Sequence, residues 1–270
     1  MICREASIPY DRTLITKALA VGDSSKWSLR PEEYLKNADI EYKLKSSAFN
    51  INTAKSEVVL TSGEHIHYDK LLIATGSTVV KPNIPGINSK GVHTVRTNLD
   101  QTNIKEAAKT SKKIVVIGAS FIGSESASCL ANKEREVHLV FETDYPLQRA
   151  LGSEVGKLMK QEHEANGVKL HPGVRAVAIN ADADGHVTSV KLSDGSNVEC
   201  DLVVLGTGVK PATEFLKNTG IELAKDGGIV CDPFLQTNVK NVYAAGDIAS
   251  YPYWPTGGRA RTEHWVTSLD

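Results

Sequence analysis

The sequence has no uninterrupted apolar run near the roughly 20 residues of a membrane-spanning helix, so we expect no membrane span. Its first residues, MICREASIPYDR, have neither the apolar core nor the small-residue cleavage site of a signal peptide. An excess of one charge is also absent, because 31 basic and 32 acidic residues give a formal net charge of −1. Such a balance offers no electrostatic footprint for nucleic acid. We therefore expect small molecules or proteins as partners.

Closely spaced cysteines are absent as well. The four cysteines, Cys3, Cys129, Cys200 and Cys231, are scattered along the chain. This spacing argues against a redox-active dithiol and against a zinc or iron–sulfur ligand set, so no metal is predicted. Cys129 follows a glycine-rich turn within an expected helix, where a buried packing role is favoured over a reactive one. A disulfide reductase is disfavoured for the same reason.

A glycine-rich turn after an apolar strand is the most informative feature of the chain. The strand KKIVVIG leads into Gly118-Ala-Ser120-Phe-Ile-Gly123, and a helix follows. In a dinucleotide-binding turn the first glycine permits the tight turn, the second lets backbone approach the pyrophosphate, and the third lets the helix pack closely on the strand. Here Ser120 replaces the second glycine, which crowds the phosphate but offers a hydroxyl donor. The alternative is an ordinary strand–turn–helix without a nucleotide.

An acidic residue ends the next strand, VHLVF. Glu142 lies 24 residues after Gly118, close to the roughly 20 expected for an acid that accepts both ribose hydroxyls of NAD. A carboxylate there would repel a 2′-phosphate, so the sequence favours NADH over NADPH. A helix is then expected from near Ser153 to a point before Gly167, followed by a hairpin meander from Val174 to Val198 and a buried strand, Leu202 to Leu205.

Two further segments, Tyr68 to Gly76 and Thr237 to Asp247, each read as a strand that ends in a turn of small residues. Two short motifs, Pro9 to Lys17 and Glu263-His264-Trp265, are also present. With the GASFIG turn, they resemble the pyridine nucleotide-disulfide oxidoreductase superfamily of FAD-dependent reductases. The run PYDRTLITK is similar to the PYDRPxLSK segment of its ferredoxin reductase and apoptosis-inducing-factor-like branch. Rieske-associated members of that branch often carry serine in the glycine turn.

The resemblance implies an α/β fold with two nested Rossmann-like dinucleotide-binding domains. Residues 1–99 and 226–270 would form a discontinuous FAD domain, and residues 100–225 would form the NAD domain. The family begins with its own strand–GxGxxG–helix, and no such motif precedes Glu5. We therefore expect a chain that is truncated at both ends.

The resemblance also assigns roles to single residues. Asp247 would bond the ribitol of FAD, Glu5 the adenosine ribose, and Arg12 a flavin phosphate. Lys17 would lie beside the isoalloxazine, and Glu125 would approach the nicotinamide and pair with Lys17. The predicted FAD contacts are Glu5, Arg12, Lys17, Ala74, Thr75, Gly76, Gly246 and Asp247. The predicted NAD contacts are Gly118, Ser120, Phe121, Ile122, Gly123, Glu125, Glu142, Gly206 and Gly208. The predicted catalytic residues are Lys17, Glu125 and Trp265.

The implied activity is an FAD-dependent NADH:acceptor oxidoreductase. Hydride would pass from NADH to the flavin, and electrons would then leave to an iron–sulfur or quinone-type acceptor. The alternative is an NADH-binding, redox-responsive interaction protein without turnover, or an inactive fragment of an apoptosis-inducing-factor-like protein. FAD and NAD are the predicted cofactors, and an iron–sulfur protein or domain is the predicted partner. The sequence leaves open whether the chain forms a homodimer. A cytoplasmic location is expected, with a mitochondrial location as the alternative.

Overall fold

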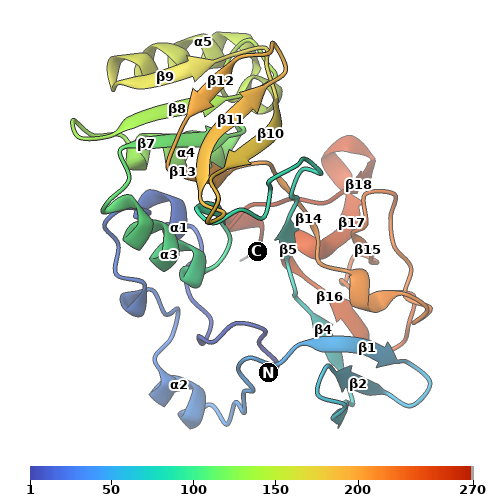
Figure 1. Cartoon of the computed structure of the whole chain (residues 1–270). Helices are drawn as coiled ribbons and strands as arrows, with labels where there is room; N and C mark the ends of the chain where they lie inside the picture. Colours follow the sequence, from blue (N-terminus) through green and yellow to red (C-terminus); the bar gives the residue numbers. More distant parts are fainter. Residues whose placement is uncertain (269–270) are drawn as a thin grey trace. The chain divides into compact units, whose positions relative to one another are not determined.

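The computed structural model describes residues 1–268, which form two compact units (Figure 1). The first unit contains Met1–Tyr10, Ser28–Thr78 and the residues from Val209 on. The second unit contains Asp11–Trp27 and Val79–Gly208. Each unit is thus assembled from separate stretches of chain, as a nested layout requires. The assignment of residues 1–99 and 226–270 to FAD, and of 100–225 to NAD, stays a prediction.

A five-stranded parallel sheet forms the centre of the second unit. Its strands follow the order β6 (Val92–Thr94), β13 (Leu202–Leu205), β7 (Lys113–Ile117), β8 (Glu136–Val140) and β9 (Val168–His171). Strands β7 and β8 are direct parallel neighbours, as the crossover through the GASFIG turn requires. The central strands β7 and β13 are almost completely buried apolar runs, because a parallel sheet is covered on both faces. The predicted α/β, Rossmann-like fold class is confirmed.

Helices cover one face of this sheet, and an antiparallel meander covers the other (Figure 1). Helix α3 (Asn98–Ala108) contacts β6 and β13, α4 (Phe121–Leu130) contacts β7, β8 and β13, and α5 (Gln148–Ala165) contacts β9. The meander has the strands β10 (Ala176–Ala181), β11 (Val187–Leu192) and β12 (Asn197–Glu199).

One core joins the meander to the sheet. Val190 and Leu192 of β11 pack with Val115 of β7 and Val203 of β13, and all four are buried. Short helix α1 (Leu14–Lys17) packs against α4 within the same unit. The segment Asp11–Trp27 therefore belongs to the second unit, although the resemblance assigns it to the FAD domain.

The first unit has several small sheets. Strands β1 (Ala48–Asn52), β2 (Glu57–Leu60) and β3 (His65–His67) are antiparallel, whereas β4 (Leu71–Ile73) and β16 (Val242–Ala244) form a parallel pair. The remaining strands are β15 (Ile229–Val230), β17 (Ala249–Tyr253) and β18 (Gly258–Ala260) in one sheet, with β5 (Ser77–Val79) beside β14 (Val209–Pro211) in another. The remaining helices of this unit are α2 (Glu32–Asn37), η2 (Glu214–Leu216), η3 (Gly246–Ile248), η4 (Trp254–Thr256) and η5 (Val266–Ser268), whereas η1 (Ser24–Lys26) belongs to the second unit.

Within residues 1–268, no helix combines the length and the apolar composition needed to cross a bilayer.

Helix α5 begins earlier than the sequence predicts. Its first residue is Gln148, and Gly152 interrupts it with a non-helical backbone at φ 80° and ψ 172°. The predicted start near Ser153 therefore marks the stretch after the kink. A glycine adopts this positive φ without steric cost, which explains why the helix bends there.

A buried histidine makes stability depend on pH. His163 on α5 is 2% exposed, and its Nε2 has no hydrogen-bond partner within the described residues. Burial lowers the pKa of His163 below its usual value near 6.5. Below pH 6.5 the unfolded chain binds a proton more readily than the folded one, so this contribution to stability is present above pH 6.5 and is lost as the pH falls.

We expect His163→Leu to remove this pH dependence. Urea unfolding at pH 8 and pH 5 should show the variant losing less stability than the unmodified chain, because leucine cannot be protonated. An exposed histidine, His186, gives the control variant His186→Leu, which should lose as much stability between pH 8 and pH 5 as the unmodified chain. An equal loss of stability in the unmodified chain and in His163→Leu would contradict the assignment.

Candidate functional site

A cavity of about 680 Å³ lies in the second unit, at the carboxyl ends of the parallel strands β7, β8 and β13. Ligands of open α/β sheets bind at this edge. The lining comes from the glycine turn, the end of β8, the start of α5, the segment after β13, and parts of two loops. Its residues are Pro82–Ile84, Ile117–Ser120, Val140–Thr143, Leu147–Ala150, Val174–Val177 and Gly206–Gly208.

Three glycines let backbone pack on backbone beside this cavity. A Cβ on Gly123 would lie 1.7 Å from the carbonyl oxygen of Gly118, and one on Gly206 would lie 2.6 Å from the Cα of Gly123. Gly118 also has a φ of +99°, and its added Cβ would lie 2.3 Å from the carbonyl oxygen of Gly206. The first and third glycines thus have the turn and packing geometry that the sequence predicts. Gly206 has a packing role beyond the one predicted for it.

The start of helix α4 is at the same turn. Ser120 is its N-cap in extended conformation, and its side chain makes no capping hydrogen bond. Instead the Ser120 hydroxyl donates to the Gly206 carbonyl at 3.4 Å. The first backbone N–H groups of a helix have no partner within that helix, and with the helix dipole they favour an anion. The turn therefore has the donors that a pyrophosphate needs.

The acid at the end of β8 has a basic neighbour. Glu142 lines the cavity, and Arg149 Nη2 lies 3.0 Å from its Oε2. Both side chains are more than half exposed, so the ion pair is weak and can open for a ligand. Sequence reasoning missed Arg149. The available signal was a basic residue seven positions after the acid, at the start of the following helix.

A second cluster joins α1 to α4 within the same unit. Lys17 Nζ lies 3.3 Å from both carboxylate oxygens of Glu125, which confirms the predicted pairing. The two residues belong to one unit, however, and do not meet across two domains as predicted. The Thr16 hydroxyl also donates a hydrogen bond to Glu125 Oε2. Thr16 is buried, whereas the Lys17 side chain is more than half exposed. Sequence reasoning did not identify Thr16. The roles of Lys17 and Glu125 in hydride transfer stay predictions.

Not every predicted NAD contact lines the cavity. Its walls include Gly118, Ser120, Glu142, Gly206 and Gly208. The lining does not include Phe121, Ile122, Gly123 and Glu125, which are on α4. Of these, Gly123 supports the turn from behind, through its close approach to Gly118.

Several predicted FAD contacts gather at one edge of the first unit. Ala74, Thr75 and Gly76 follow β4, and Gly246 and Asp247 follow β16. Because β4 and β16 are adjacent and parallel, both turns lie at the same edge. Gly76 and Gly246 have φ values of 61° and 75°, which favour glycine. The edge therefore has a polar acid beside two turns that hold no bulky side chain.

The other predicted flavin contacts are divided between the two units. The Tyr10 hydroxyl donates to Glu5 Oε2 at 2.5 Å in the first unit. In the second unit, the Arg12 guanidinium donates to the Arg96 carbonyl. Trp265 is exposed and lies in the first unit. Their roles toward a flavin stay predictions.

All four cysteines are free thiols. Burial raises the pKa of Cys200 to about 12, and burial likewise raises the pKa of Cys231. These two side chains are therefore protonated packing residues near neutral pH. Cys129 is partly buried, with its Sγ 3.8 Å from the Lys17 carbonyl.

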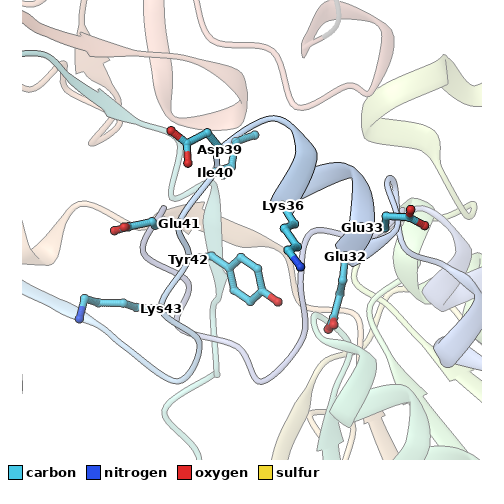
Figure 2. A pocket seen from close by; sticks show the side chains of 8 residues that line it. All are labelled: Glu32, Glu33, Lys36, Asp39, Ile40, Glu41, Tyr42 and Lys43. Atoms are coloured by element: carbon cyan, nitrogen blue, oxygen red, sulfur yellow. The ribbon is translucent and has the colours of Figure 1, made fainter.

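A wide hollow of about 910 Å³ lies beside helix α2 in the first unit (Figure 2). It is lined by Glu32, Glu33, Lys36, Asp39, Ile40, Glu41, Tyr42 and Lys43. Its charges are of both signs and exposed, and it contains no predicted site residue. It is therefore not a candidate for the nucleotide site.

The sheet order, the glycine turn and the acid after β8 define a Rossmann-type dinucleotide-binding protein. The chain belongs to the pyridine nucleotide-disulphide oxidoreductase family, whose profile matches residues 1–270. The predicted membership is thus confirmed.

Individual relatives agree with this family. The chain is 32% identical to mouse (Mus musculus) apoptosis-inducing factor 3 over 259 residues, which are 96% of this chain and 42% of that protein. It is 33% identical to rhodocoxin reductase of Rhodococcus erythropolis over 268 residues, covering 98% of this chain and 62% of that protein. A ferredoxin reductase from Rhodopseudomonas palustris has a similar structure, with a TM-score of 0.94 and 32% identity. That match covers 100% of this chain and 66% of the reductase chain.

Proposed function

We propose that this chain is the nucleotide-binding part of an FAD-dependent NADH:acceptor oxidoreductase. The observation that carries the proposal is that the glycine turn, the start of α4 and Glu142 all line the same cavity. Its position at the carboxyl edge of a parallel sheet is where dinucleotides bind in this fold class. Family membership supports the same activity.

Different residues of the second unit bind different parts of NADH. N–H groups at the start of α4 bind the pyrophosphate, and Glu142 accepts the adenosine ribose hydroxyls. Gly206 and Gly208 let the chain after β13 pass close to the dinucleotide. Lys17 and Glu125 orient the nicotinamide end, and their opposite charges set the local electric field at the nicotinamide.

The residues that the family resemblance assigns to FAD are proposed to hold it here. Asp247, at the edge formed by β4 and β16, would accept hydrogen bonds from ribitol hydroxyls. The backbone at Gly76 and Gly246 allows close approach there. Glu5 would hold the adenosine ribose, Arg12 would neutralise a phosphate, and Trp265 would lie by the flavin. FAD, when bound, supplies acceptance of a hydride from NADH and release of electrons one at a time.

An iron–sulfur protein is the electron acceptor that we propose. Similarity to a ferredoxin reductase and to rhodocoxin reductase supports this class of partner. The chain spans about two thirds or less of the length of these relatives. A homodimer and a cytoplasmic or mitochondrial location stay predictions from the sequence.

A second candidate function is NADH binding without turnover, in a redox-responsive interaction protein. The similarity to apoptosis-inducing factor 3 favours this alternative. Two measurements on the purified chain test these functions, and the second separates them. Both functions predict tight NADH binding in a fluorescence titration. Only the reductase also predicts retention of added FAD, with flavin absorbance that bleaches on addition of NADH. Failure to bind NADH would contradict both proposals.

A further inference from the structure

We infer that Thr16 is a positioning residue that holds the Glu125 carboxylate in its working orientation at the nicotinamide. This inference rests on the proposed function, because it takes the nicotinamide as the group that Glu125 meets. The structure shows the anchoring itself. The Thr16 hydroxyl on α1 donates to Glu125 Oε2 on α4, and both helices belong to the second unit.

Two groups compete to fix Glu125, and they differ in burial. Thr16 is 8% exposed, whereas the side chains of Lys17 and Glu125 are 55% and 38% exposed. Lys17 Nζ lies 3.3 Å from each oxygen of Glu125 and 3.3 Å from the Thr13 carbonyl, so its charge is shared among three acceptors. The contact with Thr16 is therefore the more specific of the two.

The physical cost of ordering each partner points the same way. A solvent-exposed ion pair contributes little, because two long side chains lose freedom and water and salt screen the charges. A threonine has a single stiff χ1 torsion, so little freedom is lost when its hydroxyl is aimed. A hydrogen bond to an ionised carboxylate is also roughly twice as strong as a neutral one. Thr16 thus selects the rotamer of Glu125, and Lys17 mainly supplies positive charge.

The location of Glu125 gives this anchoring a consequence. Glu125 lies on α4, one helical turn after Phe121 at the helix start. Under the proposed function the helix start holds the pyrophosphate, and the dinucleotide extends from there toward the nicotinamide. Losing the Thr16 hydroxyl should therefore weaken contact with the nicotinamide and spare the adenosine half. ADP-ribose contains that half and lacks the nicotinamide, so it isolates the difference.

The test compares NADH and ADP-ribose binding to the 270-residue chain and its variants. Thr16→Val keeps the shape and removes the hydroxyl, and Thr16→Ser keeps the hydroxyl. Thr102→Val changes an exposed threonine of α3 in the same unit and serves as the matched control. We expect Thr16→Val to weaken NADH binding roughly tenfold, the range for losing a hydrogen bond to a charged group. ADP-ribose binding should stay unchanged, and Thr16→Ser and Thr102→Val should match the unmodified chain for both ligands.

Other binding patterns would overturn the inference. Unchanged NADH affinity in Thr16→Val would show that the hydroxyl does not position Glu125. Equal loss of NADH and ADP-ribose binding would show a structural role only.

A stability cycle tests the anchoring without any ligand. Unfolding midpoints in urea are measured for Thr16→Val, Glu125→Gln and the double variant. We expect clearly non-additive shifts, because the two side chains share one hydrogen bond. Additive shifts would overturn the anchoring. If the unmodified chain bound neither NADH nor ADP-ribose, the proposed function and the nicotinamide role would fail together, while non-additivity would still establish Thr16 as the anchor of Glu125.

Discussion

Gly123→Ala is expected to destabilise the second unit by roughly 4 kcal/mol or more, which is the range of the most damaging single substitutions. The added methyl group would lie 1.7 Å from the Gly118 carbonyl oxygen, and that neighbour is backbone rather than a flexible side chain. Relief would require α4 to move away from the turn after β7. Unfolding in urea, followed by circular dichroism, measures the loss, and NADH binding should disappear with it.

A second glycine separates crowding from backbone strain. Gly185, in the turn between β10 and β11, has a φ of +82° and no atom within 4 Å of an added Cβ. Gly185→Ala should therefore cost only about 1 kcal/mol, from the unfavourable φ alone. Similar losses for Gly123→Ala and Gly185→Ala would contradict the close packing of α4 on the turn.

Glu142→Ala is expected to weaken NADH binding by roughly 1–3 kcal/mol, the range for losing hydrogen bonds to a charged acceptor. The unmodified chain should prefer NADH to NADPH, because the carboxylate accepts ribose hydroxyls and repels a 2′-phosphate. In Glu142→Ala the preference should shift toward NADPH, since Arg149 loses its carboxylate partner and can meet the phosphate. Fluorescence titration with both nucleotides measures the four dissociation constants.

Arg149→Met supplies the matched control on the other half of this ion pair. The pair is exposed, so the variant should fold normally and bind NADH almost as the unmodified chain does. Its affinity for NADPH should fall, because the only change near the phosphate is the loss of a positive charge. If the unmodified chain bound NADPH as tightly as NADH, Glu142 would not be the ribose acceptor.

Local sequence patterns predicted the elements that are buried along their whole length, because every residue of such an element is apolar. The run Leu202 to Leu205 is uniformly apolar because β13 is covered on both faces, and the structure places the strand at those residues. The start of α5 was harder to predict. Leu147 and Gly152 both adopt positive φ, and the backbone before this kink is fixed by a hydrogen bond from the Leu147 N–H to the Ala119 carbonyl rather than by a capping side chain. No local pattern encodes that support.

The sequence by itself determined the order of the crossover, from the strand through Gly118 and Gly123 to the acid at Glu142. Turn geometry and the repulsion between a carboxylate and a phosphate depend on residue type and spacing along the chain. Only the tertiary structure decided what surrounds these residues. It placed Arg149 against Glu142, the backbone of Gly206 against Gly123, and Thr16 against Glu125. Each pair joins different elements of the fold, so its geometry follows from how those elements pack.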